Sequence, residues 1–149
     1  MTTHQQLLYH IVFSTKNRKR LLNDAIRDDG FAYMAGICKN LSGYALDIGG
    51  FYDHAHLLVR IPAKVTVSDF VGKLKSNTSK HINEKNGSSL SFAWQDGFGA
   101  FTVSPSKKDA VGKYVRNQME HHQKLTFEEE YLEFLKKHEV DFDERYVFD

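Results

Sequence analysis

Asp53-His54-Ala55-His56-Leu57-Leu58-Val59 is the stretch on which the fold and the chemistry of this chain depend. In a strand, side chains two positions apart point to the same face, so His54 and His56 would present two imidazoles together. Ala55 and Leu57 would then face the opposite layer. Imidazole is the commonest metal ligand among side chains, and two on one strand form half of a metal site. The alternative is a pair of polar side chains on a solvated sheet face.

The residues around this stretch predict its neighbours in a sheet. Residues 44–51 and 54–61 are two β-rich runs separated by two residues, which predicts a hairpin. Residues 7–13, rich in β-branched and aromatic side chains, predict a first strand, and a glycine-rich turn within 94–104 enters a fourth. The pair Gly49-Gly50 predicts a bulge or a close approach by another chain.

Helices are predicted between the strands and after the last one. The first begins near Asn23 or Asp24 and carries an apolar stripe to Leu41, and the second, with Ser68-Asp69 as its cap, extends to about Asn86 before a loop at 86–89. A third is expected from Lys107 to about His122, and Thr126 caps a fourth over 127–138. The order βαββαβ followed by helices predicts an α+β, ferredoxin-like fold: an antiparallel sheet with two helices on one face, plus C-terminal helices.

Composition indicates one globular domain spanning residues 1–149, with 41% hydrophobic and 13% aromatic residues. Twenty Lys and Arg nearly balance nineteen Asp and Glu, so the net charge of the chain does not by itself indicate a nucleic-acid partner. Cys38, the lone cysteine, lies on the apolar stripe of the first helix and is expected to be a small core side chain. We find neither a signal peptide nor a membrane-spanning run, and therefore expect a cytoplasmic protein without a membrane partner.

The second half of the candidate site lies on the predicted third helix. Tyr114 and Gln118 are four residues apart and therefore share a helix face. Helical tyrosines are mostly half-buried packing residues. A glutamine one turn away changes that expectation, because its amide oxygen could complete a metal site of two nitrogens and one oxygen while Tyr114 lies over an open coordination position.

At this point the sequence resembles the single-tyrosine HUH transposases, which comprise the transposases of single-stranded insertion sequences and their REP-associated relatives. The histidine-hydrophobic-histidine stretch at 53–59 looks like the HUH motif, and Tyr114 through His122 looks like the tyrosine helix of that family. The resemblance extends to Tyr9 through Lys16, to Trp94-Gln95 and Gly97 through Phe101, and to Asp143 through Tyr146. It therefore covers nearly the whole chain in the order of the family.

The resemblance implies that His54, His56 and Gln118 bind a divalent metal, Mg²⁺ or Mn²⁺, and that Tyr114 is the nucleophile. It implies cleavage and rejoining of single-stranded DNA by transesterification through a 5′-phosphotyrosine. It further implies single-stranded DNA with hairpin ends as the substrate, and a homodimer in which the tyrosine helix of one chain serves the histidines of the other.

Basic residues supply the candidate DNA contacts. They follow the first strand, lie on the second helix and flank the tyrosine: Lys16, Arg18, Lys19, Arg20, Lys73, Lys75, Lys80 and Arg116. A cation run after a strand is equally well explained as a solvated loop. His121 and His122 are expected in a solvated helix C-terminus, where cations are favoured, with a supporting role in DNA binding as the alternative.

Two other classes of function compete with a transposase. One is a domesticated, non-catalytic protein that binds single-stranded nucleic acid, and the intact His54, His56, Tyr114 and Gln118 argue against it. The other is a metal enzyme acting on small phosphoesters, which would need neither the tyrosine nor a basic surface. Metal-dependent cleavage of hairpin-bearing oligonucleotides separates all three.

Overall fold

The computed structural model of the chain describes residues 1–87 and 91–149, so positions 88 and 89 of the loop expected at 86–89 lie outside the described residues. The strands are β1 (Leu8–Ser14), β2 (Tyr44–Gly50), β3 (His54–Arg60) and β4 (Gly99–Val103). The helices are η1 (Lys16–Arg18), α1 (Asp24–Asn40), α2 (Val67–Asn86), η2 (Pro105–Lys107), α3 (Lys108–Arg116), α4 (Gln118–His121) and α5 (Phe127–Lys137). Within these two ranges, no helix has the length and apolar character that crossing a bilayer requires.

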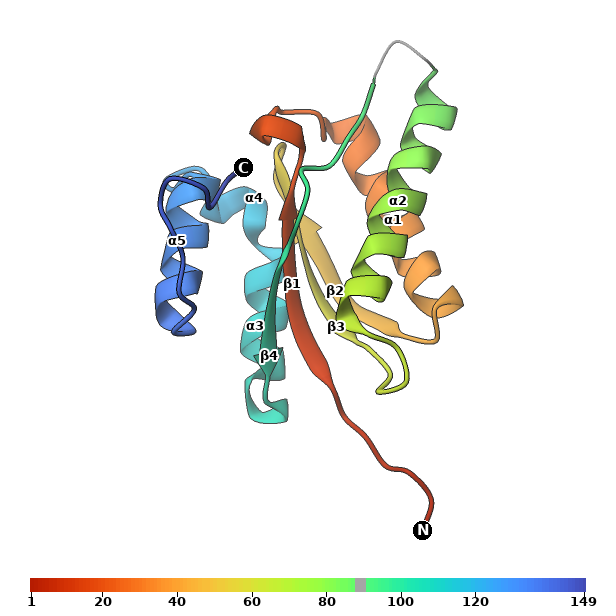
Figure 1. Cartoon of the computed structure of the whole chain (residues 1–149). Helices are drawn as coiled ribbons and strands as arrows, with labels where there is room; N and C mark the ends of the chain where they lie inside the picture. The colour runs from red at the N-terminus through yellow and green to blue at the C-terminus, as the bar shows by residue number, and fades with distance from the viewer. Residues whose placement is uncertain (88–90) are drawn as a thin grey trace.

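The four strands form one sheet in the order β2-β3-β1-β4, and every neighbouring pair is antiparallel. Helices α1 and α2 lie against one face of this sheet, while α3, α4 and α5 lie on the other side (Figure 1). This is the ferredoxin-like arrangement predicted from the sequence, with C-terminal helices added. Its central strands are β1 and β3, so the histidine pair lies in the middle of the sheet.

Strand alternation decides which layer each side chain of β3 enters. Ala55, Leu57 and Val59 are fully buried in the main core, which β1 and β3 form with α1 and α2. Cys38 belongs to this core, and burial raises the pKa of its thiol to about 12, as befits an inert packing residue. His54 and His56 project from the opposite face, as the alternation of a strand requires.

Close packing of α3 against the sheet brings the C-terminal helices to the histidines. Gly49 pairs with His56 across the β2–β3 ladder, and a Cβ atom at Gly49 would overlap the backbone carbonyl of Val115 in α3. A Cβ at Gly112 of α3 would likewise overlap the carboxylate of Asp47 in β2. The close approach predicted at Gly49 is therefore made by a helix of the same chain.

A second, smaller apolar cluster holds α5 over β1 and β4. Val12 and Phe101 from the strands pack against Phe127 and Leu135 from the helix. The C-terminal tail joins this cluster through Phe148, whose carbonyl accepts a hydrogen bond of 3.1 Å from Arg18 Nη1. The sheet face that carries the histidines is thus covered by the last third of the chain.

Two predicted helix details are wrong. The expected third helix is interrupted at Asn117, which has φ −97° and ψ 23°, so that α3 and α4 are separate segments. Asparagine competes for backbone hydrogen bonds and favours such helix ends. The second helix is capped by Thr66 rather than Ser68-Asp69: its hydroxyl accepts from the Asp69 amide at 3.1 Å, and Asp69 falls in the first turn, where a carboxylate favours the helix dipole.

Candidate active site

His54 is fully buried and oriented by a carboxylate. Its Nδ1 lies 2.7 Å from Asp53 Oδ1, and its Nε2 lies 3.0 Å from Oε1 of Gln118. The amide nitrogen of Gln118 donates to the carbonyl of Tyr114 at 3.2 Å, which turns the amide oxygen toward the histidine. Gln118 therefore reaches His54 although α3 and α4 are broken between Tyr114 and Gln118.

His56 is oriented by a third histidine, which sequence reasoning missed. His10 on β1 lies two positions from Val12, the residue that pairs with His56, and its Nε2 is 2.8 Å from His56 Nδ1. Burial lowers the pKa of His10 to about 3, and it lowers the pKa of His56 to about 4 despite the neighbouring Glu130. Both rings are thus neutral near pH 7, the state in which imidazole binds a metal.

Tyr114 on α3 lies beside the histidine pair. Its ring centroid is 5.8 Å from that of His56, and its hydroxyl is 3.2 Å from His121 Nε2. The same hydroxyl donates to the carboxylate of Glu130. Burial, followed by the charge of Glu130, raises the pKa of Tyr114 well above its usual value, so the phenol is protonated in this arrangement.

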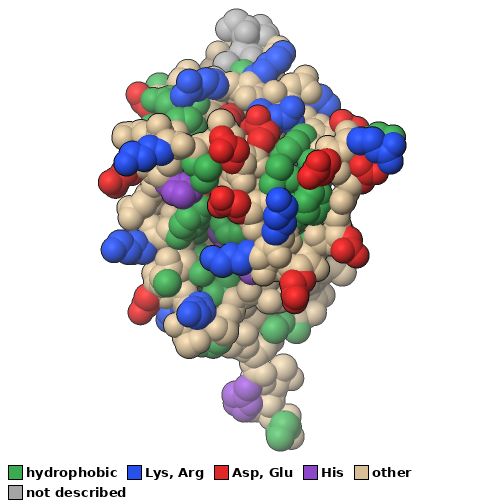
Figure 2. Space-filling model, turned by 90° about the vertical axis from the view of Figure 1, so that its left-hand side faces the viewer, with side chains coloured by type: hydrophobic (Ala, Val, Ile, Leu, Met, Phe, Trp, Pro, Cys, Tyr) green, Lys and Arg blue, Asp and Glu red, His purple; other side chains and the backbone are tan. Residues whose placement is uncertain are grey.

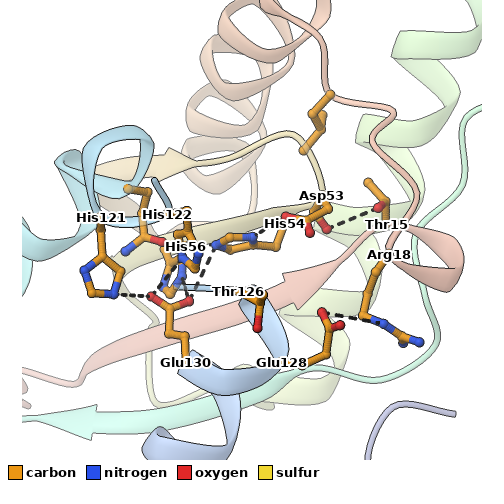
Figure 3. Close-up of polar contacts among 12 residues, drawn as sticks. Thr15, Arg18, Asp53, His54, His56, His121, His122, Thr126, Glu128 and Glu130 are labelled. Carbon is orange, nitrogen blue, oxygen red and sulfur yellow. Dashed lines mark hydrogen bonds and ion pairs between the residues drawn. The ribbon is translucent and has the colours of Figure 1, made fainter. Parts of the chain in front are cut away.

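Potential metal-binding atoms of four side chains lie together in the site: His54, His56, His122 and Glu130 (Figure 3). Sequence reasoning did not place Glu130 or His122 there. Glu130 is only 2% exposed. Burial alone would raise its pKa, but His56 and His122 hold that pKa far below its usual range. A signal was available: Glu130 shares the apolar helix face with Phe127 and Phe134, where a carboxylate has no packing role.

The prediction that His122 lies in a solvated helix end is wrong. His122 is buried, its Nδ1 lies 2.7 Å from the carbonyl oxygen of Leu125, and its ring centroid is 4.4 Å from that of His54. The chain reverses after α4 to begin α5, and this reversal turns the ring into the site. His121 is half-buried, and its side chain contacts Tyr114 as well as solvent.

The donor atoms fit a divalent cation. Asp53 and the Leu125 carbonyl only accept hydrogen bonds, so Nδ1 of His54 and Nδ1 of His122 carry the protons in their neutral forms. The Nε2 lone pair of His54 then faces the oxygen of Gln118. Nε2 of His122 is buried 3.1 Å from Glu130 Oε2 and has no hydrogen-bond partner among the residues that the structure describes. A positive ion between such converging lone pairs satisfies all of them.

The predicted DNA-binding residues fall into separate places. Lys16 and Lys19 are exposed in and after η1, at the end of β1. Arg18 pairs with Glu128 at 3.8 Å and lies over the Phe148 ring, and Arg20 lies over the Tyr52 ring at 4.5 Å. These two arginines therefore also serve as contacts within the chain.

The remaining predicted cations are not gathered at the histidines. Lys75 donates to the carbonyls of Gln95 and Gly97 at 2.7 and 2.6 Å. Lys73 and Lys80 are exposed on α2, which covers the other face of the sheet from the site. Arg116 is exposed and paired with Asp47 at 2.7 Å.

A cavity of about 740 Å³ opens beside the tyrosine, between α3, α5 and β4. Phe101, Phe134 and His138 line it together with Tyr114, and Lys107 and Lys137 add cations that sequence reasoning did not select. Figure 2 shows the side of the molecule on which α5 lies: hydrophobic side chains lie exposed in a hollow among charged residues of both signs. Tyr114 therefore lies at the wall of an aromatic-lined opening.

The fold and the site together define a single-tyrosine HUH protein, in which a histidine pair on a central strand faces a tyrosine on a following helix. The family described as "Transposase IS200 like" matches residues 3–118, and the chain belongs to that family. The resemblance noted in the sequence is thereby confirmed, and membership supports a DNA-cleaving, strand-transferring enzyme.

Relatives and solved structures agree with this assignment. The chain is 30% identical over 119 residues to the IS200 transposases of Salmonella typhimurium and Salmonella typhi, covering 75% of this chain and 76% of each relative. A crystal structure of a protein assigned as a transposase from Deinococcus radiodurans matches with a TM-score of 0.64 and 21% identity over 80% of this chain and 95% of the other. A REP-associated tyrosine transposase bound to a REP hairpin matches with a TM-score of 0.57 and 12% identity over 77% and 70%. At these identities the two structures show a shared fold.

Proposed function

We propose that the chain is a transposase that cuts and rejoins single-stranded DNA through Tyr114, with His54, His56 and Gln118 holding a divalent metal. The observation that carries this proposal is the position of the Tyr114 hydroxyl, on the sheet face where Nε2 of His54 and Nε2 of His56 converge with the Gln118 oxygen. A nucleophile beside a Lewis-acid site is the arrangement that transesterification of a phosphodiester requires.

The reaction needs no external energy source. The phenolic oxygen of Tyr114 attacks the scissile phosphorus, the bond from phosphorus to the 3′ oxygen breaks, and that oxygen leaves as a 3′-hydroxyl after taking up a proton. A 5′-phosphotyrosine remains, so the phosphodiester energy is retained. Attack by another 3′-hydroxyl on the phosphotyrosine reverses the step and joins two strands without ATP.

The high pKa of Tyr114 indicates why the metal matters. His54, His56 and Gln118 would hold a divalent ion, which would polarise a phosphate oxygen and supply positive charge that favours the phenolate. Nitrogen ligands favour Mn²⁺ on affinity, whereas cellular supply favours Mg²⁺, and both suit this donor set. Asp53 accepts from Nδ1 of His54, which leaves the Nε2 lone pair of that ring for a metal, and His10 Nε2, 2.8 Å from Nδ1 of His56, orients the second ring.

The aromatic cavity supports a single-stranded substrate. Phe134, which is half-buried at the wall of this cavity, would stack on an unpaired base, which a duplex would not offer, and Lys107 and Lys137 would contact the phosphates. The similar REP-associated transposase binds a REP hairpin, and a hairpin next to single-stranded DNA is the substrate we propose for this chain. The exposed Lys16 and Lys19 would contact its backbone.

The homodimer implied by the resemblance is also part of the proposal, with one change. Tyr114 lies beside His56 of its own chain, because α3 packs against β2 and β3 of the same sheet. The geometry therefore favours a complete site within each protomer over sites shared between two.

An adduct experiment tests the nucleophile. Wild-type protein incubated with Mn²⁺ and a hairpin oligonucleotide labelled at its 3′ end should retain the label after denaturation. Tyr114→Phe removes one oxygen and little volume, so it should bind the same DNA and form no adduct. Tyr146→Phe, at an exposed tyrosine, is the matched control and should form the adduct normally.

Three outcomes separate the competing functions. An adduct mapped by peptide mass to another tyrosine contradicts the assignment of Tyr114. Cleavage without an adduct indicates a nuclease that uses metal-activated water. Binding without any cleavage indicates a non-catalytic nucleic-acid protein.

A further inference from the structure

Glu130 lies outside the part of the chain that matches the family, yet its carboxylate is at the centre of the site. The match ends at Gln118, and Glu130 comes from α5, twelve residues later. It is held there by the packing of Phe127 and Leu135 against the sheet, and Figure 3 shows its carboxylate pointing toward the histidines. A buried carboxylate in such a position requires a compensating positive charge.

The two oxygens of Glu130 face different partners. Oε1 lies 2.9 Å from Nε2 of His56 and 3.5 Å from Nε2 of His54. Oε2 accepts from the Tyr114 hydroxyl and lies 3.1 Å from Nε2 of His122. One carboxylate thus connects the histidine pair with the nucleophile.

The spacing of these atoms is close to that of ligands around one small ion. Bonds of about 2.1 Å in an octahedral shell separate neighbouring ligand atoms by about 3.0 Å and opposite ones by about 4.2 Å. The ligand atoms of His54, His56, His122 and Glu130 all lie within 4.8 Å of one another. The ligands His54, His56 and Gln118 are neutral and contribute no negative charge. Mg²⁺ and Mn²⁺ bind preferentially at sites where a carboxylate supplies negative charge.

We propose that Glu130 is a metal ligand, supplied by α5 through Oε1, while Oε2 keeps the Tyr114 hydroxyl in place. The inference rests on the metal site of the proposed function and adds a charged ligand to it. It also makes metal binding and the docking of α5 mutually dependent, since an ion that binds only the docked form stabilises that form.

Calorimetric titration of the DNA-free protein with Mn²⁺ tests the ligand directly. Glu130→Gln keeps the shape of the side chain and removes its charge, and it should weaken Mn²⁺ binding by about tenfold or more. Glu133→Gln, an exposed carboxylate one turn along the same helix, removes the same charge and should leave the Kd within about twofold. Unchanged or tighter Mn²⁺ binding by Glu130→Gln overturns the proposal, and would mean that the carboxylate occupies the site without serving the metal.

His56→Ala separates this inference from the proposed metal site itself. Loss of Mn²⁺ binding in His56→Ala but not in Glu130→Gln leaves the site standing and removes only Glu130 from it. Mn²⁺ binding that survives in both variants removes the site as well.

Hydrogen–deuterium exchange provides a readout that does not depend on a variant. In the wild-type protein, Mn²⁺ should slow amide exchange across residues 127–137, because the ligand restrains α5. In Glu130→Gln this protection should be lost while exchange in α1 is unaltered. If the variant does not fold, the wild-type measurement decides: exchange in α5 that is independent of Mn²⁺ overturns the proposal.

Discussion

At the scale of single residues, each imidazole of the histidine pair has its own orienting partner. Asp53 precedes His54 in the chain and accepts from its Nδ1, whereas His56 depends on His10, forty-six residues earlier on the neighbouring strand. Both contacts leave Nε2 directed at the centre of the site. Such partners fix the tautomer and the ring orientation, and metal affinity depends on them nearly as much as on the ligands.

Removal of the carboxylate beside His54 should therefore weaken metal binding without removing a ligand. Asp53→Ala frees the ring to rotate and to move its proton to Nε2, and we expect Mn²⁺ affinity to fall about 10- to 100-fold. Asp28→Ala, an exposed aspartate on α1, is the control for the change in net charge. Calorimetry on both variants measures the difference, and equal affinities would show that the 2.7 Å contact of Asp53 has no role in the site.

At the scale of elements, the approach of α3 to β2 sets the position of Tyr114. Gly49 lies opposite His56 in the sheet. The backbone carbonyl of Val115, the residue after Tyr114, packs directly against Gly49. The missing side chain at Gly49 thus determines how closely Tyr114 can approach the histidines. The strand position and the helix position are coupled through this one contact.

A single methyl group at that contact should separate the two elements. Gly49→Ala would force α3 away from β2, and we expect a loss of about 1–3 kcal/mol in unfolding free energy together with a large loss of DNA adduct. Gly72→Ala on α2 is the control, since a Cβ there meets no atom of the described residues within 4 Å. It should stabilise the helix by about 0.5–1 kcal/mol and leave the adduct unchanged. Denaturant unfolding and the adduct assay measure both effects, and a fully active Gly49→Ala would contradict this account.

At the scale of the whole molecule, the sheet separates two layers with different tasks. The layer of α1 and α2 carries the main apolar core, and the layer of α3, α4 and α5 closes over the site. Tyr114 and the histidines of the same chain lie together, because α3 in the second layer packs against β2 and β3.

Mixing two inactive variants tests whether sites are complete within one chain. His56→Ala and Tyr114→Phe chains should remain inactive together after subunit exchange, since every protomer then lacks one half of its own site. Adduct formation by the mixture, on the Tyr114 of the His56→Ala chain, would show instead that sites are shared between protomers. Exchange is verified beforehand with differently tagged wild-type chains.

The sequence by itself determined what local periodicity controls. Alternation along residues 54–60 was enough to place His54 and His56 on one face and Ala55 and Leu57 on the other. Helical spacing and cap residues located α1 and α5 closely, and the order of elements predicted the sheet. These features follow from the geometry of a single strand or helix, which neighbouring residues in the chain define.

Only the tertiary structure decided what meets the histidines. Glu130 reaches His56 across seventy-four positions, and His10 reaches it across forty-six. The same folding places Lys73 and Lys80 on the far side of the sheet, although their charge alone had suggested DNA contact. Periodicity fixes the face to which a side chain points, but packing between distant elements fixes which groups that face encounters. The buried carboxylate of Glu130 was therefore visible only once α5 was packed over the sheet face that carries the histidines.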